Sequence, residues 1–158
     1  MSDQTLLING TEVVVVDSTT VELLEIAVQG PPGPQGVPGP ASGDGVTAPA
    51  GEAIGGHRGV VTDAAGLAWY ADNTNPSHLG RFAGVTLGAV AAGGTASIVR
   101  AGNITEPTWN WTAHAPVFLS TNGLLTQTLP LTGYLQVVGI ALSPTVLFVN
   151  PREPLATL

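Results

Sequence analysis

The sequence predicts a mainly β protein in three zones: an N-terminal β arm over residues 1–29, a collagen-like neck and linker over 30–50, and a small β-barrel or sandwich over 51–158. Two observations predict this class. Short apolar runs recur at intervals of roughly 8–12 residues between turn signals, without a long 3.6-residue period. A run with glycine at every third position separates these runs from the N-terminal arm.

The N-terminal arm is predicted to form β-strands. Leu6–Ile8 leads into Asn9-Gly10, a strong hairpin signal, and residues 11–16 follow with four consecutive valines. The segment 21–28 fits either a strand with a phase slip or a short helix, and we favour the strand. An arm of 29 residues is too short to bury a core alone, so we expect it to need a partner surface.

Glycine occupies every third position of residues 30–41, in four triplets with proline at five of the eight other positions. A collagen triple helix needs this period, because three polyproline-type chains meet on an axis with room only for a hydrogen atom. The alternative is a stiff Pro-rich linker in a monomer. We favour the triple helix, and since four triplets are too few to hold three chains, the flanking domains are expected to trimerise. The predicted trimerisation residues are Gly30, Gly33, Gly36, Gly39, Pro31, Pro32, Pro34 and Pro38.

The C-terminal zone carries every Trp, Tyr and Phe of the chain and is therefore expected to hold the core. The expected strands are residues 60–62, 67–70, 81–87, 95–100, 116–119, 124–129, 134–142 and 145–149. Because the chain has no Lys and few charges, its edge strands lack the usual protection against pairing with other chains. We therefore expect the edges to be closed in a barrel or covered by neighbouring copies in a homotrimer.

Charge and composition narrow the function. Four Arg, no Lys and 11 acidic residues give a formal net charge of −7, which argues against a nucleic-acid partner. The absence of Cys excludes disulfides and cysteine-held zinc. Charged residues make up 9% of the chain, which suits a component of an assembly, although a secreted β domain could share this composition. The first residues do not resemble a secretion signal and no apolar run is long enough to span a bilayer, so we expect neither general secretion nor membrane insertion.

Residue types that could support catalysis are present but scattered. His57, His78 and His114 lack the spacing of metal ligands, and we interpret them as structural or solvated. The alternative is that these histidines come together in the fold, or that one from each chain meets across a trimer axis, to bind a metal or an anion. The acids of the C-terminal zone are Glu52, Asp63, Asp72, Glu106 and Glu153. A pair of carboxylates could hydrolyse a glycosidic bond, but acids beside turn residues more often cap the backbone. We expect no enzymatic activity, no cofactor and no metal site.

Trp109 and Trp111 are the candidate recognition or interface residues. Because they alternate along the chain, they are predicted to lie on the same side of a strand. One hypothesis is a stacking platform for a sugar or a protein partner. The other, which we favour, is a structural role as a lid of the barrel or a subunit interface.

Together these features resemble small structural proteins of tailed bacteriophages, of the tail-fibre, baseplate or head-decoration type. The C-terminal domain is also similar to capsid-cement-type β-barrels. The motifs that carry the resemblance are GGHRGVV at 55–61, GLAWYA at 66–71, GVT at 84–86, EPTWNW at 106–111, PVFL at 116–119, GLLTQ at 123–127 and VGIALS at 138–143. The resemblance implies a homotrimeric virion protein, made in the bacterial host cytoplasm, with an N-terminal arm docked to the virion and a distal β domain. It carries over no catalytic residue.

The resemblance leaves two functions open. The first is a short fibre or spike of the tail or baseplate, whose distal domain contacts a host surface receptor or neighbouring virion proteins. The second is a capsid decoration (cement) trimer on the phage head. In both, the expected partners are other copies of the chain and other phage virion proteins.

Overall fold

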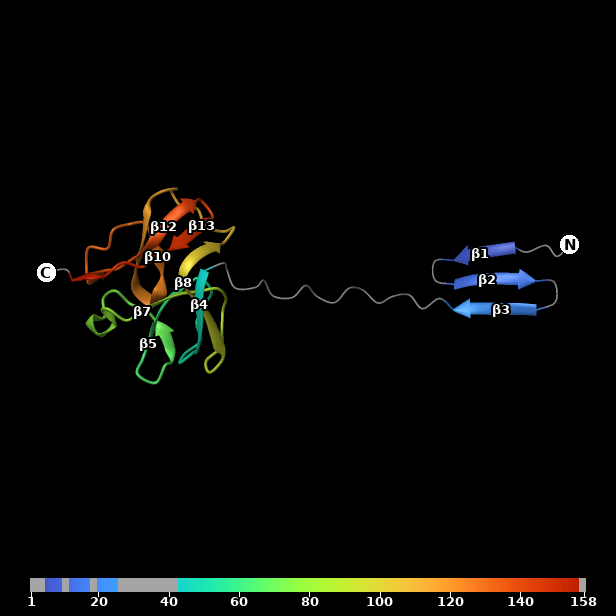
Figure 1. The fold of residues 1–158 in the computed structure, drawn as a ribbon, viewed down its shortest axis with the longest axis horizontal. Coiled ribbons are helices and arrows are strands. Elements are labelled where there is room, and N and C mark those ends of the chain that lie inside the picture. Colours follow the sequence, from blue (N-terminus) through green and yellow to red (C-terminus); the bar gives the residue numbers. More distant parts are fainter. Residues whose placement is uncertain (1–4, 10–11, 18–19, 26–42, 157–158) are drawn as a thin grey trace. The chain divides into compact units, whose positions relative to one another are not determined.

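The computed structural model describes residues 5–9, 12–17, 20–25 and 43–156. The chain divides into two units, Met1–Val37 and Pro38–Leu158. In Figure 1 the N-terminal unit is blue, and the C-terminal unit runs from cyan through green and yellow to red. All the residues named above for the collagen-like neck lie outside the described residues, so the triple helix stays a prediction.

The N-terminal unit holds an antiparallel sheet in the order β1-β2-β3. Its strands are β1 (Thr5–Asn9), β2 (Glu12–Asp17) and β3 (Thr20–Glu25). The strand predicted over 21–28 is confirmed as far as Glu25, and its last residues lie outside the described part. The pairing of β1 with β2 agrees with the hairpin that Asn9-Gly10 predicts.

The register of this small sheet gives both of its faces an apolar row. Two neighbouring cross-strand rows are Ile8–Val13–Leu24 and Leu7–Val14–Leu23. Because successive residues of a strand belong to opposite faces, these two rows belong to opposite faces of the sheet.

The C-terminal unit is built on a nine-stranded sheet that curls into a half-barrel (Figure 1). The strand order is β10-β9-β12-β13-β8-β7-β5-β6, with β4 paired to β8, and every pair is antiparallel. The strands are β4 (Gly43–Pro49), β5 (Gly59–Thr62), β6 (Ala68–Tyr70), β7 (Phe82–Thr86), β8 (Thr95–Thr105), β9 (Pro116–Leu119), β10 (Leu125–Thr126), β12 (Val137–Ser143) and β13 (Val146–Val149). A separate pair joins β11 (Tyr134–Leu135) to β14 (Leu155–Ala156), and two 3-10 turns are η1 (Pro76–His78) and η2 (Thr121–Gly123).

The mainly β prediction is confirmed, and the described residues include no α-helix. Strand β4 lies in residues 43–49, which we had expected to belong to the linker. The strand was missed because its small residues show little alternation between apolar and polar types. The single strand expected over 134–142 is interrupted at Gln136. Full closure into a barrel is not reached, since the two ends of the strand order, β10 and β6, are not paired with each other. The part of the chain that the structure describes holds no helix long and apolar enough to cross a membrane.

The long strand β8 organises the half-barrel. Residues Thr95–Gly102 of β8 pair with β4 along one edge. Along the opposite edge, β7 pairs with Ile98 and Val99, and β13 then takes over from Gly102 to Thr105. The sheet therefore divides at β8, and this division lets it bend around two separate hydrophobic clusters.

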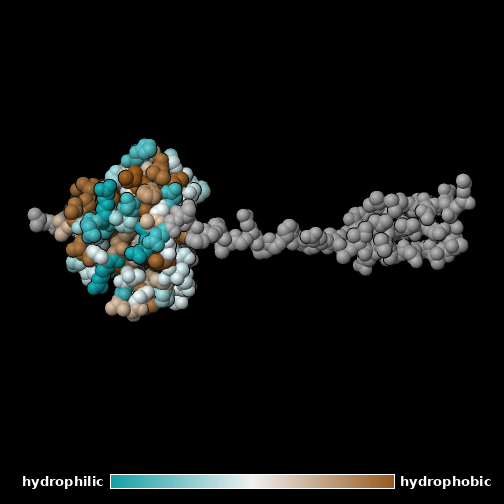
Figure 2. Space-filling view, in the orientation of Figure 1, coloured by the Kyte–Doolittle hydropathy of each residue, from teal (hydrophilic) through white to brown (hydrophobic). Residues whose placement is uncertain are grey.

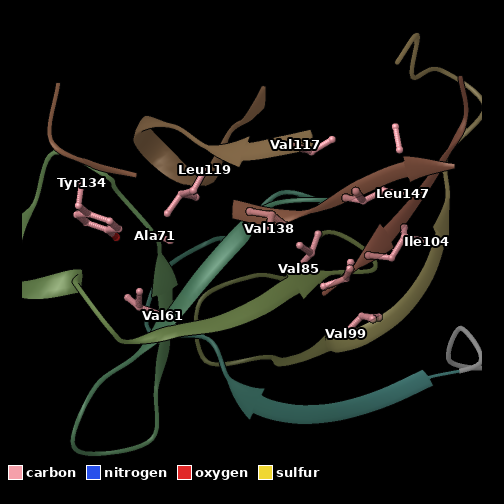
Figure 3. Packing of buried hydrophobic residues seen from close by; sticks show 12 residues of the cluster. Val61, Ala71, Val85, Val99, Ile104, Val117, Leu119, Tyr134, Val138 and Leu147 are labelled. Carbon is pink, nitrogen blue, oxygen red and sulfur yellow. The ribbon is translucent and has the colours of Figure 1, made fainter. Parts of the chain in front are cut away.

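The central strands send alternate side chains into two different cores. Val60 of β5 is buried in the smaller cluster with Ile54 and Ile98, whereas Val61 is buried in the larger one. Figure 3 shows side chains from β5, β7, β8, β9, β12 and β13 meeting in the larger cluster. Two buried residues of the smaller cluster, Ala50 and Ala68, are joined by an isolated β-bridge. On the visible surface of this unit, hydrophobic and hydrophilic residues are intermixed (Figure 2).

Candidate functional site

The two predicted tryptophans lie close together, but not on a strand. Trp109 and Trp111 belong to the segment between β8 and β9, where the backbone makes turns instead of continuing the sheet. Their ring centroids are 5.4 Å apart, and the Trp109 ring meets the His57 ring edge-on at 5.2 Å. The strand expected at this point was wrong, because Pro107 and the two turns interrupt it. The three rings form what we call the Trp cluster: His57, Trp109 and Trp111.

An acidic residue contacts the histidine of the Trp cluster. The Glu106 carboxylate lies 3.3 Å from Nδ1 of His57 and accepts hydrogen bonds from the Thr108 amide and hydroxyl at 2.9 and 2.7 Å. These Thr108 bonds, and to a lesser extent the charge of His57, lower the pKa of Glu106. His57 itself has a positive φ of 56° and donates its amide to the Thr86 carbonyl at 2.9 Å.

The two indoles of the Trp cluster lie against the core. Both are half-buried and pack against the larger hydrophobic cluster. The Trp111 amide donates to the Pro144 carbonyl at 2.9 Å, which ties the segment to the β12–β13 turn. The indole Nε1 of Trp111 is buried without a hydrogen-bond partner among the described residues. The structural role of the two tryptophans and the stacking platform both stay predictions.

The other histidines and acidic residues singled out in the sequence have the following surroundings. His78 accepts a hydrogen bond from the Asp72 amide through Nδ1 at 3.1 Å, and Asp72 Oδ1 in turn accepts from the Thr74 amide at 2.8 Å. His114 is exposed, with a positive φ of 64°. Over residues 43–156 and the described strands of the arm, no group of three His, Cys, Asp or Glu side chains is placed to hold a metal ion.

The structure gathers a set of residues that sequence reasoning passed over. Two adjoining hollows, of about 530 and 370 Å³, share the lining residues Gly80, Phe82, Ala83 and Arg100. Arg81 lines the first hollow and Arg152 the second. Three of the four cations in the chain therefore line one continuous surface depression, which we call the arginine groove.

Backbone irregularities build this groove. Asp44 of β4 is paired with Ala101, and the next residue, Gly45, is paired with Val99, so Arg100 is the extra residue of a β-bulge. Ala83 is likewise left out of the β5–β7 pairing, between Phe82 and Gly84. β-bulges redirect side chains and occur frequently beside functional sites. Both bulged residues line both hollows.

Charges of the opposite sign also line the groove. Asp63 lines the first hollow, and Asp44 and Glu153 line the second. Within the described residues, the guanidinium groups of the three groove arginines make no ion pair and no hydrogen bond. The sequence offered one hint of this groove, since Arg81 and Arg100 fall inside predicted strands, but the bulges that bring them together left no recognisable pattern.

Comparison with protein-family models found no match, and comparison with curated proteins found none either.

Proposed function

We propose that this chain is a non-enzymatic homotrimeric structural protein of a phage virion, forming a short fibre or spike of the tail or baseplate. In this proposal, residues 1–29 attach the protein to the virion and the Gly-x-y run forms a triple-helical neck. The C-terminal half-barrel then contacts the host surface or neighbouring virion proteins. The alternative role, a cement trimer on the phage head, uses the same trimer at a different place on the particle.

The observation that carries the proposal is the strict glycine period of residues 30–41, which only a triple helix requires. The spacing to the next strand is compatible with this neck. Strand β4 begins at Gly43, and a single residue separates it from the last of the four triplets in the sequence. Three C-terminal units held in this way lie beside one another, as a closed threefold assembly requires.

Two apolar surfaces support assembly. The sheet of the N-terminal unit has an apolar row on each face, which further copies of the same sheet could cover. In the C-terminal unit, Ile140 of β12 and Phe148 of β13 are cross-strand partners that remain exposed, and Leu142, at the bulge that follows in β12, is exposed as well. Exposed apolar rows of this kind on a charge-poor protein are typical of subunit interfaces.

The first test is the absolute mass of the full chain in solution, by light scattering after size exclusion. The proposal expects a mass three times the monomer's 15.9 kDa. A monomer would remove the triple helix and the trimer. With a trimer in hand, immunogold labelling of the virion separates the two locations, because gold on heads supports the cement role and gold on tails supports the fibre.

The second test addresses the neck itself with two variants one residue apart. Gly36→Asp introduces a side chain at the triple-helix axis, whereas Gln35→Asp adds the same charge at an outward position of the repeat. We expect proteinase K to cut the first variant between residues 30 and 41 much faster than the second, as mapped by mass spectrometry. Equal cutting of both variants would mean that these residues are an ordinary linker.

A further inference from the structure

The arginine groove gathers most of the cations of an otherwise acidic chain. The protein has a net charge of −7 and four cations, yet three of these cations line a single depression. Their side chains are exposed, and none is neutralised by an ion pair within the described residues. Evenly scattered cations would better support solubility, so a concentration of unpaired guanidinium groups indicates an anionic ligand.

We propose that the arginine groove binds an acidic saccharide, that is, a sugar chain carrying carboxylate or sulfate groups. As the identity of a receptor this inference rests on the proposed function, whereas the binding itself can be tested apart from it. A guanidinium group presents its donors in a planar fork that matches carboxylate and sulfate oxygens, and such charge-assisted bonds are about twice as strong as neutral ones.

The acidic residues of the groove favour a sugar over a nucleic acid. Three arginines share the lining with Asp44, Asp63 and Glu153, so the local formal charge is 3 − 3 = 0. A nucleic acid carries a phosphate on every nucleotide and would meet these carboxylates with repulsion. A saccharide carries hydroxyl groups as well as acidic groups, and Asp44 and Glu153 can accept hydrogen bonds from those hydroxyls.

In the first hollow, the hydrogen bonds of Asp63 are made to groups other than Arg81. Asp63 Oδ1 accepts from the amides of Ala65 and Leu67, both at 2.9 Å. Its Oδ2 accepts from the indole of Trp69, also at 2.9 Å. This carboxylate is therefore committed to the β5–β6 turn, and Arg81 remains available to a ligand.

An aromatic ring and the open shape complete the fit to an extended sugar. Phe82 lines both hollows, is half-buried, and rests against the larger hydrophobic cluster. We expect this ring to supply the apolar contact that the C–H groups of a pyranose require. The two hollows adjoin through shared residues. We therefore expect the groove to take several linked sugar units, and not one isolated anion.

The backbone positions that carry the arginines are fixed before any ligand arrives. Arg100 is the bulged residue of β8. The Arg81 amide donates to the His78 carbonyl at 3.0 Å. The Arg152 carbonyl accepts a bond of 2.7 Å from the side chain of Gln136, which is 1% exposed. Such preorganisation reduces the entropy that binding would cost.

The test measures binding of the full chain by isothermal titration calorimetry. The probes are oligosaccharides of alginate, polygalacturonate and hyaluronan for carboxylates, heparin fragments for sulfates, and maltohexaose as a neutral chain. We expect at least one acidic series to bind and maltohexaose not to bind. Binding should weaken as salt is raised, because the contacts are charge-assisted.

Matched variants locate the site. Arg100→Gln should weaken binding at least about tenfold, as expected for losing one charge-assisted pair. Arg58→Gln removes the same charge from the one arginine outside the groove and should leave affinity within about twofold. Arg152→Gln, on a different segment from Arg100, provides a second loss of affinity should Arg100→Gln fail to fold. Thermal melting of each variant establishes that it is folded.

Three results would overturn the inference: no binding to any acidic series, equal losses in Arg58→Gln and Arg100→Gln, or polyglutamate and single-stranded DNA binding as tightly as the saccharides. These results are distinct from failure of the proposed function. A monomer that still binds an acidic sugar through Arg100 would contradict the proposed trimer and support the binding site. A trimer that binds no acidic sugar would support the trimer and contradict the binding site.

Discussion

Gly84 of β7 lies against the carbonyl oxygen of Val99 of β8, so closely that a Cβ atom on residue 84 would overlap that oxygen. The φ angle of Gly84 is +143°, a region that other residues rarely adopt. This contact sits directly after the bulge at Ala83 and one residue before Arg100. A single glycine thus allows β7 and β8 to approach each other where the arginine groove is formed.

Gly84→Ala should destabilise the C-terminal unit by at least about 2 kcal/mol, since it combines backbone strain with overlap in a closed space. Chemical denaturation followed by Trp fluorescence measures this change. Gly88→Ala is the matched control, because a Cβ there meets nothing within 4 Å. Its unfolding free energy should stay within about 0.5 kcal/mol of the wild type or rise slightly. Similar losses in both variants would contradict the role given to Gly84.

The Tyr134 hydroxyl should be dispensable at neutral pH. It is buried with no hydrogen-bond partner among the described residues, so Tyr134→Phe is expected to keep or raise the unfolding free energy at pH 7. Tyr70→Phe makes the same chemical change but removes the acceptor of a 2.7 Å bond from the Gly55 amide. It should cost about 0.5–1.5 kcal/mol. A larger loss in Tyr134→Phe than in Tyr70→Phe would show that the Tyr134 hydroxyl has a partner.

Alkaline pH gives Tyr134 a second, independent readout. Burial, and then the charge of Asp72, raises the pKa of Tyr134 from 10.0 to about 12. The unfolded chain therefore releases this proton first, and stability should fall as pH rises from 10 toward 12. Denaturation at a series of pH values should show this fall in the wild type and a shallower one in Tyr134→Phe. Identical slopes would mean that Tyr134 ionises as freely in the folded state as in the unfolded state.

Asp63 should contribute to stability under neutral but not strongly acidic conditions. The bonds from the Trp69 indole and the Leu67 amide lower its pKa below 3.8 in the folded state. A depressed carboxylate pKa stabilises the fold above the unfolded value and loses this effect as pH falls through the folded value. Asp63→Asn should therefore melt lower than the wild type at pH 7, and the gap should narrow below about pH 3.8. Asp44→Asn, at an exposed carboxylate, serves as the control, and a gap that is constant with pH would contradict the assignment.

Leu147 tests how much the larger hydrophobic cluster contributes to the stability of the half-barrel. Its side chain is 0% exposed in the larger cluster, so Leu147→Ala should cost about 2–5 kcal/mol. Leu131→Ala deletes the same atoms from a side chain that is 88% exposed and should change stability by less than about 0.5 kcal/mol. Urea unfolding measures both variants. A cost for Leu131 comparable to that for Leu147 would indicate that Leu131 is covered by another copy in solution.

Short-range patterns explain what could be predicted here. The strands at 60–62, 116–119 and 145–149 were expected nearly as they occur, because each is a compact apolar run bounded by turn residues. Strand β4 was missed because its small residues give little local signal and its register with β8 is set by pairs such as Gly43–Gly102, which lie far apart in the sequence. The strand expected at Trp109 does not form, because local turns at this point outweigh the alternation of the two tryptophans.

The sequence by itself determined the β class, the low charge, the position of the core aromatics and the glycine period of residues 30–41. These properties follow from composition and from neighbours along the chain. Tertiary structure alone decided that Val60 and Val61 enter different cores and that two bulges turn Arg100 and Ala83 toward one depression. A bulge is a mismatch between two strands, so neither strand encodes it alone, and the arginine groove exists only once β4, β5, β7 and β8 are paired.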